Sequence, residues 1–366
     1  MLPLSWLELD RGALASNLRG LSALVAPARV MAVVKANAYG AGAVPVARTL
    51  ADEGVEAFAV ASVAEAVELR AAGVRGAILV LTYFGPEDVR AILEHDLHPA
   101  VFTIEAARWL SSGARAIQRS ARVWVKVDTG LGRLGVRYPE AGQLIRQIAA
   151  QPGLEVAGLF STLSENPARN PAQVERLVAV CAGLPEMKDL ALSITSSQGI
   201  LSLRGGGLTY ARPGLTLLGV APEPDRLDPE LLSVAGLRPV VTWKARVAYV
   251  KRVPPGEQVG YGPRPPLDRE LPVATLAVGW ADGYHQALAR SGHVLLGGRR
   301  CRILAISANS TMVDARGVES VAIGDEAVLL GRQGEEAIGT PDIARAIGSL
   351  YRVLATVPAA VPRRLV

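Results

Sequence analysis

The alternation of short apolar runs with amphipathic stretches between residues 30 and 212 restricts the fold of this chain more than any other feature. Runs rich in Val, Ile, Leu and Ala are separated by Ala-, Arg- and Glu-rich stretches whose apolar residues lie three and four positions apart. Mostly apolar strands are typical of a parallel sheet covered on both faces. The predicted strands are 30–34, 57–61, 77–81, 99–102, 123–127, 156–160, 190–194 and 208–211. Eight such strands with intervening helices predict a (β/α)₈ barrel.

Between these strands the helical periodicity is clear enough to predict individual helices. Residues 63–72, 86–94 and 139–149 each place apolar side chains on one face, as expected of helices that cover the outside of a barrel.

The pattern changes after residue 220. Residues 221–230 are rich in proline and charge, which favours a connector, and β-branched, alternating runs follow. Antiparallel strands are predicted at 240–250, 273–280, 293–296, 301–306 and 326–330. One helix is expected after them, with Thr340 as its N-cap, Pro341 at its first position and Gly348 as its stop. We therefore expect a barrel over residues 11–230 and a β-rich domain over 231–366, joined by residues 1–10.

Composition excludes several classes of protein. The chain of 366 residues is 50% hydrophobic and 20% charged, which indicates a globular protein with a large core. The net charge of +5 is dispersed and aromatic residues make up 5%, so nucleic-acid binding is not expected. No apolar run is long enough to span a membrane, and the first ten residues lack the pattern of a secretory signal. With only Cys181 and Cys301, neither a disulfide framework nor a metal site is expected, and a cytoplasmic enzyme is the simplest interpretation.

Lys35 is the first candidate for chemistry, because the carboxyl ends of barrel strands carry the reactive groups in this architecture. It follows the first strand in V-V-K-A-N-A-Y-G, residues 33–40. Partial desolvation at the barrel mouth would favour the neutral amine, which alone can condense with a carbonyl. Taken by itself, the motif is more typical of a strand-terminal lysine that extends its amine into solvent.

Five ordered blocks extend this motif into a family resemblance. They are V-V-K-A-N-A-Y-G, W-V-K-V-D-T-G-L-G-R-L-G, R-P-G-L-T-L-L-G, V-G-Y-G and G-W-A-D-G-Y. Their order and approximate spacing resemble those of alanine racemases, which use pyridoxal 5'-phosphate, and the resemblance covers nearly the whole chain. It implies an isomerase with a (β/α)₈ barrel and a mainly antiparallel β domain that interconverts L- and D-alanine.

The resemblance implies two acid/base residues. Lys35 would hold the cofactor covalently and face one side of the substrate Cα, and Tyr261 would face the other side. In the family this tyrosine comes from the partner subunit, so a homodimer with composite sites is expected.

The remaining site residues also follow from the resemblance. Arg212 would face the pyridine nitrogen of the cofactor. Because arginine stays protonated and cannot give the ring a proton, the ring would be a weaker electron sink than one opposite a carboxylate. Phosphate-binding residues are expected at Ser197, Gly214, Leu215, Tyr39 and Tyr351, and substrate-binding residues at Arg133, Lys126 and Ala308. In the family the lysine that corresponds to Lys126 is often carbamylated. Asp282 would hold the second acid/base residue or the access loop by hydrogen bonds.

Some positions depart from the family pattern. Thr162 stands where the family has a histidine that supports the arginine, and Ala308-Asn309 stands where it has Met-Asp. Trp280 replaces a tyrosine at the inner gate, and Ala41 replaces a histidine. These changes suggest a reshaped pocket, so a broader racemase that accepts serine, ornithine or lysine is an alternative.

Three further alternatives stay open at this point. They are an amino-acid decarboxylase of the same architecture, a non-catalytic cofactor carrier built on the barrel alone, and a family member without activity. Arg212 argues against the decarboxylase, and Tyr261 with the second domain argues against the carrier.

Overall fold

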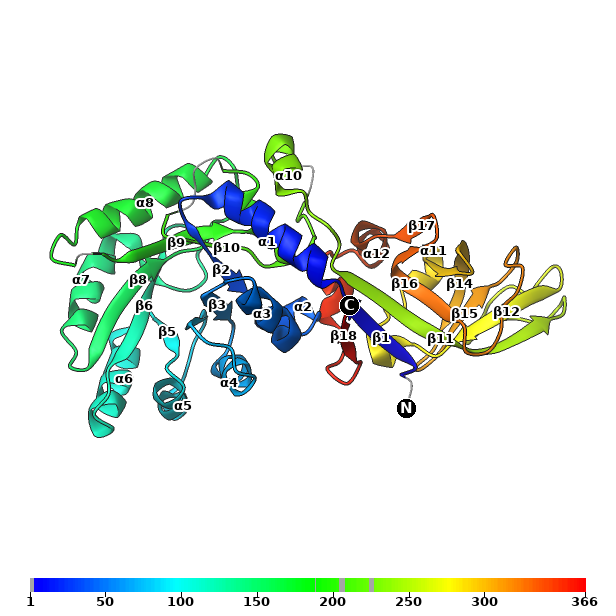
Figure 1. The fold of residues 1–366 in the computed structure, drawn as a ribbon, viewed down its shortest axis with the longest axis horizontal. Coiled ribbons are helices and arrows are strands. Elements are labelled where there is room, and N and C mark those ends of the chain that lie inside the picture. The colour runs from blue at the N-terminus through cyan, green and yellow to red at the C-terminus, as the bar shows by residue number, and fades with distance from the viewer. Residues whose placement is uncertain (1–2, 188, 204–207, 224–226) are drawn as a thin grey trace. The chain divides into compact units, whose positions relative to one another are not determined.

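The computed structural model describes residues 3–187, 189–203, 208–223 and 227–366, which form two compact units (Figure 1). The barrel unit comprises Gly12–Ala38 and Ala43–Arg238. The β unit comprises the N-terminal segment through Arg11, the short segment Tyr39–Gly42, and Pro239–Val366.

Eight parallel strands close into a ring in the barrel unit, as the sequence predicts. Each strand pairs with the next in chain order, and β10 pairs with β2 to complete the circle. The strands are β2 (Arg29–Val33), β3 (Ala57–Val60), β4 (Ala77–Val80), β5 (His98–Val101), β6 (Ala121–Asp128), β8 (Leu154–Phe160), β9 (Ala191–Ser196) and β10 (Tyr210–Arg212). A short strand, β7 (Val136–Arg137), adds to β6 outside the ring. The closed barrel confirms the predicted fold class.

Helices cover the outside of the ring (Figure 1). They are α1 (Arg11–Val25), α3 (Ala43–Asp52), α4 (Val63–Ala71), α5 (Val89–Glu94), α6 (Ile104–Ala116), α7 (Tyr138–Ala149) and α8 (Asn170–Ala182). The predicted helices at 63–72 and 139–149 are present, and the one at 86–94 begins as a 3₁₀ turn, η1 (Pro86–Asp88), before α5.

The predicted connector at 221–230 includes residues 224–226, which lie outside the described residues, and its last two residues begin a further helix, α10 (Pro229–Ala235). Its N-cap Asp228 accepts hydrogen bonds from two backbone N–H groups of the first turn. It packs so closely on α1 that a Cβ at Gly20 would lie 2.2 Å from the carbonyl oxygen of Ala235. The expected domain boundary at 230 and 231 thus falls inside α10, and the two units divide at Arg238 and Pro239.

The β unit is mainly antiparallel. Its sheet has the order β17-β16-β13-β14-β15-β12-β11-β1-β18, in which β1 and β18 pair in parallel. The bounds are β1 (Ser5–Leu9), β11 (Val241–Val253), β12 (Leu271–Leu276), β13 (His293–Leu296), β14 (Arg299–Ile306), β15 (Thr311–Asp314), β16 (Glu326–Gln333), β17 (Glu336–Ile338) and β18 (Arg363–Leu365). Each predicted strand of this region is present; β13 has the predicted ends, and the others differ at one or both ends.

The predicted C-terminal helix is present as α12 (Thr340–Ile347), but its N-cap is Gly339 and not Thr340. Gly339 has extended backbone angles, and its N–H donates to the carboxylate of Asp342 at 2.8 Å. Thr340 and Pro341 therefore occupy the first two helical positions, and Gly348 ends the helix in the left-handed region as expected.

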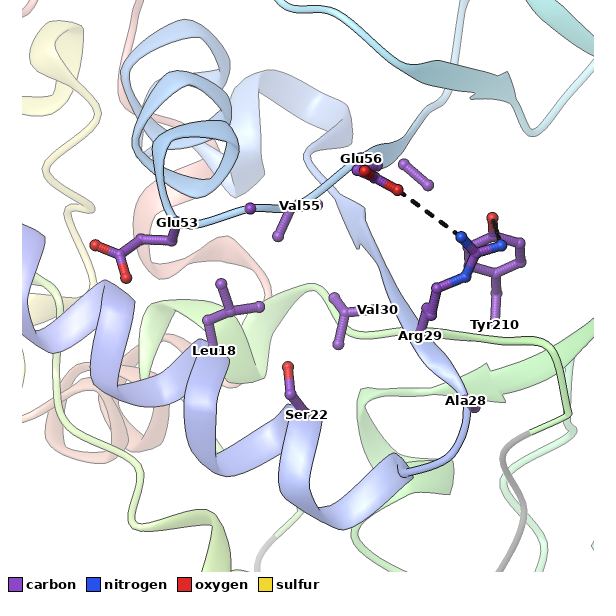
Figure 2. A pocket seen from close by; sticks show the side chains of 11 residues that line it. Leu18, Ser22, Ala28, Arg29, Val30, Glu53, Val55, Glu56 and Tyr210 are labelled. Atoms are coloured by element: carbon purple, nitrogen blue, oxygen red, sulfur yellow. Dashed lines mark hydrogen bonds and ion pairs between the residues drawn. The ribbon is translucent and has the colours of Figure 1, made fainter.

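A hollow of about 250 Å³ opens in the barrel unit where β2 and β3 begin (Figure 2). The Arg29 guanidinium lies 4.7 Å from the Tyr210 ring centre, donates to its hydroxyl at 2.6 Å, and is 3.8 Å from the Glu56 carboxylate. Lys35 follows the opposite end of β2, so this hollow lies away from the strand ends that carry chemistry in barrels.

Among the described residues, no helix has the length and apolar character needed to cross a membrane. Within the same residues, no group of three or more His, Cys, Asp or Glu side chains is arranged to hold a metal ion.

Candidate active site

Lys35 lies directly beyond β2, at the start of a left-handed turn. Ala36, Asn37, Ala38 and Tyr39 all have φ between 49° and 55°. For residues other than glycine this conformation costs about 1–2 kcal/mol each, because Cβ approaches the carbonyl oxygen. The strained segment ends before Gly40, which also has a positive φ.

The amine of Lys35 lies in a partly buried and positively charged environment. Burial lowers its pKa, and the nearby charges of Arg133 and Arg212 lower it further, while Glu65 and Glu165 oppose the shift. A larger fraction of the amine is therefore neutral and nucleophilic than in water.

Lys126, near the carboxyl end of β6, is buried beside Lys35. Its side chain donates to the Thr162 hydroxyl at 3.2 Å and lies 4.4 Å from the centre of the Phe160 ring. Burial, followed by the charges of Arg212, Arg133 and Lys35, lowers the pKa of Lys126 to about 7.

Arg212 ends β10 and is buried inside the mouth of the barrel. It donates to the Ser193 hydroxyl and, at 2.5 Å, to the carbonyl oxygen of Ser161. Burial lowers its pKa to about 10, so the guanidinium remains charged at neutral pH. Thr162, the residue in the family's histidine position, binds Lys126, and Ser161 and Ser193 hold the arginine.

Ser197 and Gly214, predicted to bind the same phosphate, are brought together. The Ser197 hydroxyl accepts a hydrogen bond from the Gly214 N–H at 2.9 Å and contacts the N–H and hydroxyl of Thr216 at 3.4 and 3.1 Å. Leu215 begins a single 3₁₀ turn, η2 (Leu215–Leu218). The loops after β9 and β10 thus meet through polar groups.

Arg133 is exposed on the loop between β6 and β7. The carboxylate of Asp128 accepts three N–H donors of this loop, from Gly130, Leu131 and Gly132, at 2.9 to 3.1 Å. These bonds fix the start of the loop that presents the guanidinium.

The other predicted residues belong to the β unit. Tyr261 is 83% exposed, and with Trp280, Ala308 and Asn309 it lines a hollow of about 690 Å³. Arg264 donates to the carbonyl oxygen of Tyr261 at 3.1 Å, which places a cation beside the tyrosine's own loop.

Tyr39 belongs to the Tyr39–Gly42 segment of the β unit, and Tyr351 is half-exposed before the short helix α13 (Arg352–Ala355). The carboxylate of Asp282 accepts the Gly279 N–H at 2.9 Å and so caps its own turn, η4 (Trp280–Asp282).

Comparison with known proteins identifies the family. The model of the alanine racemase N-terminal domain matches residues 9–222, and that of the C-terminal domain matches residues 240–365. Alanine racemases of Halothermothrix orenii and Symbiobacterium thermophilum are 34% and 36% identical to the chain, over 98% of it and 96% of each relative. The chain belongs to the alanine racemase family.

Solved structures of family members have the same fold. Alanine racemase from D-cycloserine producing Streptomyces lavendulae has a TM-score of 0.89 and 32% identity, covering all of this chain and 98% of that one. The enzyme from Bartonella henselae, solved with covalently bound pyridoxal phosphate, has a TM-score of 0.85 and 26% identity over the full length of both chains.

The residues of the barrel unit fit this family's cofactor, which carries a phosphate and a phenolic oxygen. The charges of Arg133 and Arg212 lower the pKa of both Lys35 and Lys126, so the surroundings of these two amines hold an excess of positive charge that an anionic ligand would relieve. The polar loops joined by Ser197 supply further N–H and hydroxyl groups.

Sequence reasoning missed Glu65, which contacts the turn that carries Lys35. The signal was present as S-V-A-E at residues 62–65, the spacing of a capping box. Nothing in that motif indicates that the same carboxylate also reaches the end of the neighbouring strand.

Proposed function

We propose that this chain is a pyridoxal 5'-phosphate-dependent alanine racemase that interconverts L- and D-alanine. The observation that carries the proposal is the partly buried Lys35 amine at the end of a barrel strand, under the influence of the buried Arg212 guanidinium. The lowered proton affinity of this amine favours both a covalent bond to an aldehyde and its use as a proton acceptor.

Binding of the cofactor is assigned to the barrel unit, with Tyr39 and Tyr351 as further phosphate ligands. Lys35 would hold it covalently, and Ser197, Gly214 and Leu215 would hold its phosphate. When bound, the cofactor supplies an electron-withdrawing ring that stabilises negative charge at the substrate Cα. Arg212 would donate a hydrogen bond to the ring nitrogen and, as a charged group, withhold a proton from it. This weaker activation favours proton exchange over decarboxylation.

Two residues would exchange the proton. The free amine of Lys35 would remove or return a proton on one face of Cα, and Tyr261 of the partner subunit would do so on the other face. Inversion requires this arrangement, because the proton must leave one face and return on the opposite one. Arg133 and Lys126, with the N–H of Ala308, would hold the substrate carboxylate.

The composite site makes the active species a homodimer. The biological role of this activity would be to supply D-alanine for peptidoglycan, and the enzyme would act in the cytoplasm. A broader racemase would turn over serine, ornithine or lysine as fast as alanine, and kcat/KM measured for all four separates it from an alanine racemase.

A chiral product assay tests the proposed function. With added pyridoxal 5'-phosphate and L-alanine, the chain should form D-alanine, the Lys35→Ala variant should not, and the exposed-lysine control Lys251→Ala should match the parent chain. Borohydride reduction followed by peptide mass spectrometry should place the pyridoxyl group on Lys35. Absence of D-alanine, or a label on another lysine, would contradict the proposal.

The composite site has its own test. Inactive Lys35→Ala and inactive Tyr261→Phe chains, mixed and allowed to exchange subunits, should recover part of the activity, because one site of each hybrid dimer holds both bases. No recovery in a verified hybrid dimer would contradict a shared site.

A further inference from the structure

The turn after Lys35 requires an external support. Its non-glycine residues with positive φ, from Ala36 to Tyr39, carry a strain of several kcal/mol, at about 1–2 kcal/mol each. Within the turn, Ala38 donates to the Val34 carbonyl at 2.8 Å, and Asn37 accepts from Ala43 at 2.8 Å. Such strain persists only where the surroundings over-determine the backbone.

Glu65 supplies the support from another element. One oxygen of its carboxylate accepts the Ala36 N–H at 2.6 Å and contacts the Asn37 N–H at 3.4 Å. The other oxygen accepts the N–H groups of Ala61 and Ser62 at 2.7 and 3.3 Å, at the start of α4.

These contacts join two loops through one side chain. The carboxylate ties the end of β2, where Lys35 lies, to the end of β3, where α4 begins. Ser62 in turn accepts the Glu65 N–H, so a capping box fixes the Glu65 backbone. The start of α4 therefore fixes the position of the carboxylate, and the carboxylate in turn holds the backbone of the turn after Lys35.

We propose that Glu65 is a positioning residue for the reaction: its carboxylate holds the left-handed turn after Lys35 and thereby directs the Lys35 amine toward the cofactor aldehyde. This inference rests on the proposed function, in which Lys35 bonds to the cofactor. The direction of an amine matters because a misplacement of about 1 Å can slow a reaction by about 100-fold.

A neighbouring helix start provides a matched control. Asp88 occupies the same capping position in η1, where its carboxylate accepts the Gly85 N–H at 2.9 Å. Asp88→Ala removes a helix cap of the barrel unit at a place that does not include the Lys35 turn, so it reproduces the structural part of the Glu65→Ala change.

The test measures Lys35 in the full chain without bound cofactor. Pyridoxal 5'-phosphate is added, samples are reduced with borohydride at intervals, and mass spectrometry follows the label on Lys35. Glu65→Ala should slow labelling at least about tenfold and speed amide exchange at Ala36 and Asn37. In the loaded enzyme kcat should fall at least about tenfold, with the KM for alanine within about threefold, because the residues that hold the substrate are unchanged.

Glu65→Gln is a second, milder variant that tests the proposal even if Glu65→Ala does not fold. Its amide retains one acceptor oxygen and can serve only one of the two loops, so Lys35 labelling should slow at least about threefold. Labelling within twofold of the parent in a folded Glu65 variant would overturn the proposal, as would equal slowing in Asp88→Ala. A parent chain that is labelled on Lys35 but forms no D-alanine would contradict the proposed function and leave the role of Glu65 to be read from labelling.

Discussion

Replacing Lys126 by methionine should stabilise the protein at and below neutral pH. Lys126 is 4% exposed, and its pKa falls from 10.5 to about 7 on folding, chiefly because burial penalises the ammonium form. Methionine keeps much of the buried side-chain volume and removes the charge.

The magnitude and the sign follow from proton linkage. The pKa falls by about 3.5 units, which at 1.36 kcal/mol per unit costs the folded state about 5 kcal/mol below pH 7. Between about pH 7 and pH 10.5 the unfolded chain binds this proton and the folded chain does not, so the free energy of unfolding rises with pH. Raising the pH from 6 to 9 should remove about 2 to 3 kcal/mol of the penalty.

The assay is urea unfolding between pH 6 and pH 9, without cofactor and in bicarbonate-free buffer, because carbamylation would turn the amine into an anion. At pH 6, removal of the charge should raise the free energy of unfolding by about 5 kcal/mol, and loss of the contacts with Thr162 and Phe160 should lower it by about 1–2 kcal/mol. Lys126→Met should therefore be several kcal/mol more stable than the parent at this pH. The advantage should shrink by about 2 to 3 kcal/mol at pH 9. The exposed control Lys251→Met should follow the parent. An advantage that is independent of pH, or grows with it, would refute a buried, destabilising amine.

Three further changes test other parts of the structure. Asn17→Ala removes three hydrogen bonds between a fully buried amide and the backbone, so the free energy of unfolding should fall by about 2–4 kcal/mol in urea denaturation. Asp128→Ala releases the loop that carries Arg133, and the KM for alanine should rise about tenfold or more while the protein stays folded by circular dichroism. Ala308→Met fills part of the hollow beside Tyr261, so kcat/KM for ornithine should fall relative to that for alanine, as competition assays would measure.

The barrel could be predicted from the sequence because its signal is repeated. Each strand is a short apolar run and each helix has its own periodicity, so errors of one or two residues at the ends do not change the number or order of the strands. The same holds for β11, β12, β13, β14 and β16 of the β unit, whereas the four-residue strand β15 (Thr311–Asp314) is not predicted by the sequence pattern.

Helix α10 could not be predicted in this way. It is seven residues long and begins with Pro229 in a segment rich in charge, so local composition favours a connector. It is stabilised by apolar contacts from distant parts of the chain, including Leu24 and Leu201, which no local pattern reveals.

The left-handed turn after Lys35 could not be predicted either, because it also depends on contacts with distant parts of the chain. Alanine and tyrosine have no preference for positive φ, and asparagine favours it only as a single residue, so A-N-A-Y does not indicate four successive left-handed residues. Glu65 lies 29 positions from Ala36, and the contact exists only because parallel pairing brings the ends of β2 and β3 together. The identity of the site residue could be read from the sequence, but the conformation that presents it could not.

The Thr162 position shows how a departure from a family pattern is to be read. Loss of a histidine that supports the arginine suggests a weaker hold on Arg212. In the structure Ser161 and Ser193 contact the buried guanidinium, while the Thr162 hydroxyl contacts Lys126. The support of Arg212 therefore does not require an imidazole at residue 162. The Thr162 hydroxyl acts instead on Lys126, whose lowered pKa is opposed by the charge of Asp128.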